Sequence, residues 1–88
     1  MNTFQLIISS PDGDLYRGTI RMLILRGTEG DLAVMAGHVP FVTGVKSGRC
    51  VIEDADGNRL EGTIGDGLLS VGKEQVTVLS ASLSLGES

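Results

Sequence analysis

Turn signals, most of them built on glycine, interrupt this chain at short and nearly regular intervals. This feature constrains the fold more than any other, because each glycine lets the backbone take the positive φ that tight turns need. The gaps between the signals are mostly near the ~8–12 residues expected for consecutive short strands. The signals are Pro11-Asp12-Gly13, Glu29-Gly30, Ala36-Gly37, Ser47-Gly48, Asp56-Gly57-Asn58, Gly65-Asp66-Gly67 and Gly72-Lys73-Glu74.

Between these signals, apolar residues alternate with polar ones. Phe4, Leu6 and Ile8 would lie on one face of an extended strand. The run 20–26 is richer in apolar residues, which indicates a central strand with both faces at least partly covered. Helical spacing of apolar residues is nowhere sustained without an interrupting glycine. The sequence therefore predicts an all-β fold, a flattened two-sheet sandwich or barrel of about eight to ten short, mainly antiparallel strands.

Length and charge narrow the class of protein. A chain of 88 residues is one domain with a thin core, although its 41% hydrophobic residues are enough to form one. A net charge of −4, with scattered lysines and arginines, argues against nucleic-acid binding. The first ten residues lack a signal-peptide pattern, and no stretch reaches the ~18 apolar residues of a membrane helix. We expect a soluble domain that meets a membrane only through another protein.

Residues suited to catalysis or metal binding are scarce. Any Ser-His-Asp or Cys-His device would have to use His38, the only histidine. Cys50, the only cysteine, shares a strand face with Ile52, while Arg49 and Glu53 share the other face, so we expect its thiol in the core. The ligand set for a zinc, calcium or phosphate site is missing. The sequence predicts no catalytic residue, no metal site and no cofactor.

Two loops remain open to interpretation. In the segment 37–41, glycine permits a sharp reversal and Pro40 keeps the preceding residue extended. His38 either caps this loop by hydrogen-bonding nearby backbone or lies on an interface that the loop presents. The segment 54–58 is acidic and contains glycine, which favours a solvated hairpin tip over a calcium loop.

Several stretches, in the same order along the chain, resemble the epsilon subunit of F-type ATP synthases, specifically its N-terminal β-sandwich domain. Residues 28–40 are the most distinctive, with a Glu-Gly pair followed by Gly-His-x-Pro. Departures from the family pattern are Ala33 for a common glycine, Val39 for the usual alanine, and Asp66 between paired glycines. The other similar stretches are residues 4–13, 16–18, 65–71 and 76–81.

The resemblance implies a non-catalytic subunit of the central stalk. Such a subunit joins the gamma subunit to the c subunits of the rotor ring and thereby couples ion flow to ATP synthesis. It lies at the cytoplasmic face of the membrane as a peripheral part of the synthase and is monomeric when isolated. The resemblance places the ring contact at Glu29, Gly30 and Asp31. It places the gamma contact at His38, Val39, Phe41, Val42 and Thr43.

The resemblance also sets the expected domain limits. We expect the sandwich over residues 1–82 and a frayed, small-residue tail over 83–88. The family continues into a C-terminal helical hairpin that carries its inhibitory role and, in some members, ATP binding. The sequence predicts no such hairpin here, so neither role is assigned to these residues.

Two other function classes are compatible with an all-β chain of this size. One is a free-standing protein-binding or scaffold module, and the other is a small β-sandwich enzyme. An enzyme predicts a concave pocket of convergent polar groups around His38. A docking module predicts an exposed apolar patch.

Overall fold

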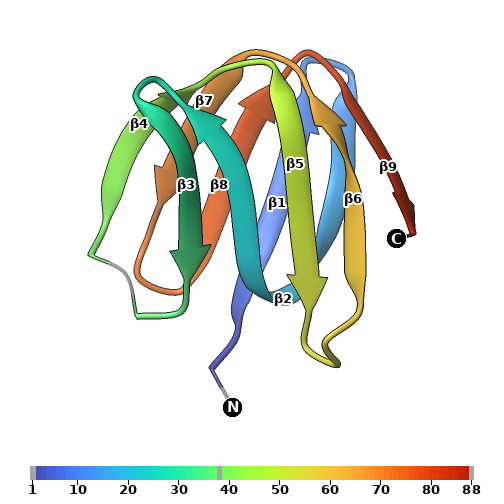
Figure 1. Cartoon of the computed structure of the whole chain (residues 1–88). Helices are drawn as coiled ribbons and strands as arrows, with labels where there is room; N and C mark the ends of the chain where they lie inside the picture. The colour runs from blue at the N-terminus through green and yellow to red at the C-terminus, as the bar shows by residue number, and fades with distance from the viewer. Residues whose placement is uncertain (1, 38, 88) are drawn as a thin grey trace.

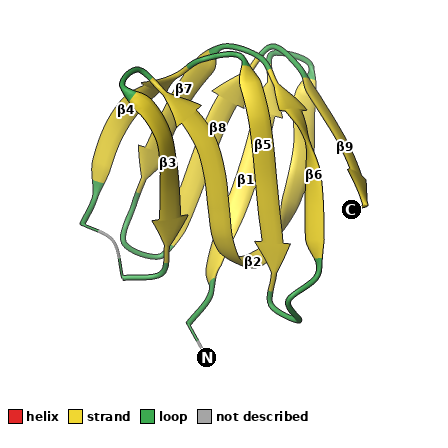
Figure 2. Ribbon diagram, viewed as in Figure 1, coloured by secondary structure: helices red, strands yellow, loops and turns green. Residues whose placement is uncertain are grey.

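The computed structural model describes residues 2–37 and 39–87, without the side chain of Glu87. In this part of the chain every regular element is a strand, and no helix occurs (Figure 2). The strands are β1 (Phe4–Ser10), β2 (Gly13–Gly27), β3 (Gly30–Met35), β4 (Phe41–Val45), β5 (Gly48–Asp54), β6 (Arg59–Ile64), β7 (Gly67–Val71), β8 (Gln75–Ser80) and β9 (Leu83–Glu87).

The strands form two layers that share β2 (Figure 1). The back layer, named from its place in Figure 1, contains β4, β7, β8, β1 and the first half of β2. The front layer contains β3, the second half of β2, β5, β6 and β9. The register of β2 against β5 shifts between Ile20 and Met22. An extra residue at this point bends a strand and increases its twist, which lets β2 pass from one layer to the other.

The pairings close the two layers into a flattened sandwich. β1 lies parallel to β8, and the other pairings found among the described residues are antiparallel. β2 also meets β4, but only through the pair Gly27 and Val45. The front and back layers are therefore joined along one side by the long strand β2, and on the other side only at one point.

The core fills the space between the layers. Leu6 and Ile8 of β1, Leu25 of β2, Leu69 of β7 and Val78 of β8 are all fully buried. These residues occupy alternate positions of their strands, so each strand turns one face inward and one outward. Burial of such side chains removes apolar surface from water, which supplies most of the favourable free energy of folding.

The connections between strands gather at two opposite ends. The upper end in Figure 1 carries the β1–β2, β2–β3, β4–β5, β6–β7 and β8–β9 connections. Backbone hydrogen bonds tie these loops to their surroundings: the Lys46 N–H, in the β4–β5 connection, donates to the carbonyl of Arg26 near the end of β2 at 2.8 Å. The Gly65 N–H donates to the carbonyl of Ser82 at 3.0 Å. The upper end is thus a connected surface and not a set of separate loops.

Most predictions of local structure are confirmed. The fold is an all-β sandwich of mainly antiparallel strands, and the second half of β2 is paired on both sides, by β3 and β5. The segment 54–58 is a hairpin tip: the Asp54 N–H donates to Asn58, and Gly57 has a φ of +88°. Cys50 is fully buried in the core.

The predicted frayed tail over 83–88 is wrong for Leu83–Glu87. These residues form β9, which pairs with the outer edge of β6. The small, polar composition of the segment suggested disorder, but Leu83 and Leu85 alternate and pack partly against the core. The two leucines and the backbone pairing together hold the strand in place.

Candidate docking surfaces

The outer face of the back layer is apolar and carries no charge at its centre. We call this surface the back face and define it by outward-facing residues of four strands. The register places Leu68 beside Leu79, and Val42 lies one strand away, beside Ser70. Val42 is 63% exposed, Leu79 53% and Leu68 44%. The back face comprises Ile7, Val42, Leu68, Ser70, Thr77 and Leu79.

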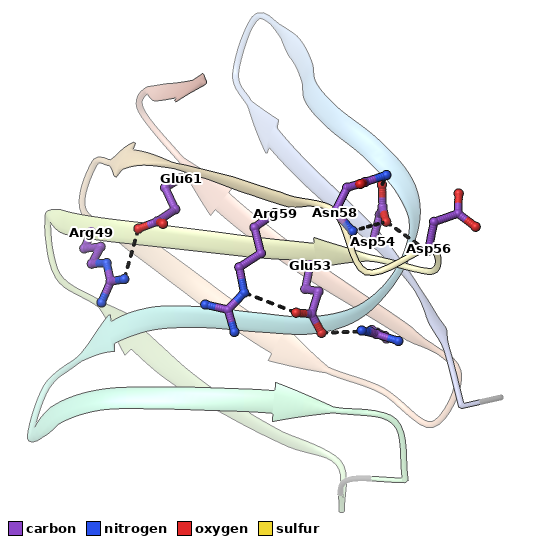
Figure 3. A network of polar contacts seen from close by, with 8 residues as sticks. Arg49, Glu53, Asp54, Asp56, Asn58, Arg59 and Glu61 are labelled. Atoms are coloured by element: carbon purple, nitrogen blue, oxygen red, sulfur yellow. Dashed lines mark hydrogen bonds and ion pairs between the residues drawn. The ribbon is translucent and has the colours of Figure 1, made fainter. Parts of the chain in front are cut away.

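The outer face of the front layer has the opposite character. Glu53 accepts a hydrogen bond from Arg21 at 2.7 Å and another from Arg59 at 3.1 Å (Figure 3). Hydrogen bonds from Arg21 and Arg59 lower the pKa of Glu53 below its ordinary value. Arg49 and Glu61 form another ion pair at 2.9 Å on the same face (Figure 3). Paired charges of this kind are typical of a solvated surface.

The predicted gamma-contact residues lie on and before β4, and the structure separates them. Val39 is 80% exposed in the β3–β4 connection, and Val42 belongs to the back face. Phe41 and Thr43 alternate with Val42, so they face the opposite side of the strand. His38 lies outside the described residues, and its two interpretations stay predictions.

The predicted ring-contact residues lie at the upper end of the molecule. Glu29 belongs to the turn between β2 and β3, and Gly30 and Asp31 begin β3. All three are exposed, and Gly30 has a φ of +129°, a conformation that favours glycine. A hollow beside this turn is also lined by Phe41 and Thr43. The structure thus brings part of the predicted gamma contact next to the predicted ring contact.

Sequence reasoning missed the two exposed leucines of the back face. Leu68 and Leu69 are adjacent in β7, so one of them has to face outward. The sequence therefore contains the signal for Leu68. It also contains one for Leu79, because the adjacent Val78 faces inward and Leu79 must then face outward. What alternation does not supply is the lateral order of strands, which gathers Leu68, Leu79 and Val42 on one surface.

Sequence reasoning also missed a contact between two loops of the upper end. One carboxylate oxygen of Asp66 accepts the Ser47 N–H at 2.7 Å and the Ser47 hydroxyl at 2.9 Å. These two hydrogen bonds hold the pKa of Asp66 below its ordinary value. Asp66, one of the three residues that depart from the family pattern, therefore ties the β6–β7 connection to the β4–β5 connection.

Cys50, the only cysteine of the chain, lies in the core. Desolvation by burial raises the pKa of the Cys50 thiol to about 11, so the thiol stays protonated and unreactive near neutral pH. No group of three or more metal-ligating side chains comes together in residues 2–37 and 39–87. Within the same residues, no helix is long and apolar enough to span a membrane.

A family model for the ATP synthase delta/epsilon chain, β-sandwich domain, matches residues 3–85. The chain belongs to this family. Its relatives in the family include the ATP synthase epsilon chain of Psychrobacter sp. (strain PRwf-1), 39% identical over 91% of this chain and 58% of that protein. The ATP synthase epsilon chain of Bacillus velezensis is 34% identical over all of this chain and 66% of that protein. The chain spans about three-fifths of the length of such relatives.

Solved structures of ATP synthases contain the same fold as this member of the family. A chain of the Euglena gracilis mitochondrial ATP synthase, in a structure of OSCP/F1/c-ring, superposes with a TM-score of 0.87 at 20% identity. The superposition covers 94% of this chain and 53% of that chain. A chain of the Tetrahymena thermophila mitochondrial ATP synthase, from a structure of the central stalk and c-ring, gives a TM-score of 0.69 at 11% identity.

The comparisons confirm the resemblance found in the sequence. The predicted family and its β-sandwich domain agree with the matching family model. The prediction that the chain is a component of a synthase, and not an enzyme by itself, agrees with the names of its relatives. The individual contact residues stay predictions.

Proposed function

We propose that this chain is the β-sandwich domain of a central-stalk subunit that joins the gamma subunit of a rotary ATP synthase to the rotor ring. The contrast between the two faces carries this proposal. Exposed leucines and a valine gather at the centre of the back face, where no charged residue lies. The ion pair of Arg17 and Asp14 lies at its β2 edge, beside Ile7, whereas the ion pairs of Glu53 and Glu61 lie across the front face. An apolar surface without charge is suited to burial against another protein, since docking there leaves no charge unpaired.

We assign the gamma contact to the back face, together with Val39 at the foot of β4. Val39 and Val42 extend the exposed apolar surface along one edge of the back layer. The ring contact is assigned to Glu29, Gly30 and Asp31 at the upper end. One partner then lies against the side of the sandwich and the other against its end. A sandwich with a packed core transmits torque between them as a rigid body.

This arrangement makes the domain a mechanical part of the synthase. It holds the gamma subunit and the ring in a fixed relation, so that rotation driven by ion flow reaches the catalytic head. The domain is then a peripheral part of the complex on the cytoplasmic side of the membrane. The domain itself supplies no catalytic group to the reaction.

Calorimetric titration into gamma subunit assembled with the catalytic hexamer tests this proposal. The exposed half of Leu68 or Leu79 contributes about 1 kcal/mol when buried, which is about fivefold in Kd. We expect Leu68→Asn and Leu79→Asn each to weaken binding by about this factor. Met35→Asn is the matched control, because Met35 is 50% exposed but lies on the front layer.

The outcomes separate the competing functions. Selective loss with the two leucine variants supports docking through the back face. Equal loss with Met35→Asn, or unchanged affinity in all three variants, contradicts the assignment of that face. Failure of the folded parent domain to bind the gamma assembly favours a free-standing scaffold module instead.

A further inference from the structure

A hollow of about 480 Å³ opens on the front layer, at the lower end of β3 in Figure 1. Two methionines line it, Met22 of β2 and Met35 of β3, and they are direct partners in the antiparallel β2–β3 ladder. Side chains that lie directly opposite in such a ladder have Cβ atoms about 4.5–5.5 Å apart and interact. The hollow therefore has a wall of two thioethers, one from each strand.

Both methionines face away from the core, but water reaches them to different extents. Leu23 and Val34, their neighbours in sequence, are buried in the core, so alternation turns Met22 and Met35 outward. Met22 is partly buried because it has a ladder partner on each side, Met35 of β3 and Glu53 of β5. Met35 is 50% exposed. Its strand, β3, pairs with β2 alone among the strands of the described residues.

The rim of the same hollow carries a guanidinium group. Arg21 is the extra residue at the register shift of β2, and it lines the hollow together with Met22. Its Nε–H donates to Glu53 at 2.7 Å (Figure 3). This is the hydrogen bond found for the Arg21 side chain within residues 2–37 and 39–87. A guanidinium has five N–H donors, so those on its terminal nitrogens remain for a new acceptor.

We propose that Met35 is a site of reversible oxidation by peroxide, and that Arg21 binds the sulfoxide oxygen formed there. A lone pair of the Met35 sulfur attacks one oxygen of hydrogen peroxide. The S–O bond forms as the O–O bond breaks, the sulfur is oxidised by two electrons, and the second peroxide oxygen leaves as water after proton transfer. A methionine sulfoxide reductase reverses the step: its two thiols become a disulfide, and the sulfoxide oxygen leaves as water.

The surroundings of Met35 suit both states of its sulfur. The thioether lies beside Met22 in an apolar contact, which a polar sulfoxide weakens. The sulfoxide oxygen is a hydrogen-bond acceptor, and the free N–H groups of Arg21 line the same hollow. Oxidation therefore exchanges one partner of Met35 for another and leaves no polar group unpaired. Both the oxidant and a reductase need access to the sulfur, which the exposed side of β3 gives.

Timed treatment of the folded domain with hydrogen peroxide, followed by trypsin digestion and mass spectrometry, tests the oxidation. Cleavage after arginine and lysine places the three methionines of the chain in separate peptides, 1–17, 22–26 and 27–46. Met35 is expected to gain one oxygen at a rate within about threefold of its rate in the urea-unfolded chain, and Met22 about fivefold more slowly than Met35. Methionine sulfoxide reductase with a thiol reductant is expected to return the peptide 27–46 to its original mass.

The Arg21 contact is followed through the side-chain N–H signals of Arg21 in ¹⁵N–¹H NMR spectra. Oxidation of the parent domain is expected to shift these signals. Met35→Leu is the matched control, because it keeps an apolar contact with Met22 but has no sulfur to oxidise, so the same treatment should leave the signals in place. Met22→Leu should retain both the oxidation of Met35 and the shift. The dispersion of each spectrum reports whether the variant is folded.

Two results would overturn the proposal. One is oxidation of Met22 as fast as that of Met35 in the folded domain. The other is an oxidised parent domain whose Arg21 signals stay in place. The site lies on the front layer, away from the back face, so it does not depend on the proposed docking. If the domain fails to bind the gamma assembly but Met35 oxidises and shifts Arg21, the docking proposal fails and the oxidation site stands.

Discussion

Gly67 is the position at which the smallest change should disturb the fold most. It begins β7 and pairs with both Val45 of β4 and Ser80 of β8. A Cβ added at Gly67 would lie 2.8 Å from the carbonyl carbon of Leu79, and nearer still to its oxygen. The obstacle is backbone of a neighbouring strand, so a rotamer change does not relieve it. In Gly67→Ala, β7 and β8 therefore have to move apart in the middle of the back layer.

The expected cost follows from that geometry. Overpacking of a rigid interior typically costs 1–3 kcal/mol, and we expect about 3 kcal/mol because main chain has to shift. A domain of this size has a total stability of about 4–13 kcal/mol, so the loss is a large part of it. The melting temperature should fall by about 10–20 °C, measured by circular dichroism, with urea unfolding giving the free energy.

Two other glycines supply the controls for Gly67→Ala. A Cβ at Gly86 would meet nothing within 4 Å, so Gly86→Ala should be neutral. A Cβ at Gly62 would lie 2.8 Å from the Ser84 carbonyl carbon, but the obstacle here is β9, an edge strand that, among the strands of the described residues, pairs with β6 alone and can shift outward. Gly62→Ala should therefore cost less than half as much as Gly67→Ala. If the free energy of unfolding of the Gly67→Ala domain lay within about 0.5 kcal/mol of the parent value, this reasoning would be refuted.

Two further predictions concern a buried thiol and a loop contact. Burial and the raised pKa of Cys50, about 11, should slow its alkylation by iodoacetamide at pH 8 by about 100-fold or more relative to the urea-unfolded chain, as followed by mass spectrometry. A native rate within tenfold of the unfolded rate would contradict the buried position. The lowered pKa of Asp66 contributes stability that is complete above the ordinary pKa of the carboxyl and is lost as the pH falls through the folded-state value. The parent should therefore be more stable than Asp66→Asn near neutral pH, and the difference should shrink as the pH falls through and below the ordinary pKa of the carboxyl, 3.8. Ser47→Ala removes one of the two donors to Asp66, so its loss of stability relative to the parent should be smaller and should shrink over the same range of pH. If the free energies of unfolding of the parent and both variants changed in parallel with pH, the contribution of this contact would be excluded.

The sequence predicts strands better than it predicts surfaces. Regular turn signals and alternation identify the strands because both depend on neighbouring residues. Alternation also shows that Leu68 and Leu69 face opposite ways, but the order of strands decides what lies beside each of them. That order depends on pairings between distant segments, such as β1 with β8. Alternation therefore predicts which way each residue of the back face points, but not that these residues lie together on one surface.

Polar contacts between loops are harder to predict for the same reason. Ser47 and Asp66 lie 19 residues apart, and nothing in either segment indicates the other. The tail was misjudged because its serines and glycine outweighed the alternation of Leu83 and Leu85. In both cases the missing information is a partner far away in the sequence.

The distribution of charge links the two proposed contacts into one mechanical design. The ion pairs of Glu53 and Glu61 lie on the front face, away from the back face that we assign to the gamma subunit. Glu29 and Asp31, which form no ion pair within residues 2–37 and 39–87, lie at the upper end, where we assign the ring. Apolar burial then supplies most of the affinity of the back face for the gamma subunit. Charge sets the position of the upper end on the ring, since exposed ion pairs contribute orientation more than free energy. A domain that holds firmly to one partner and only orients against the other can turn as part of the rotor while the contact at its end stays adjustable.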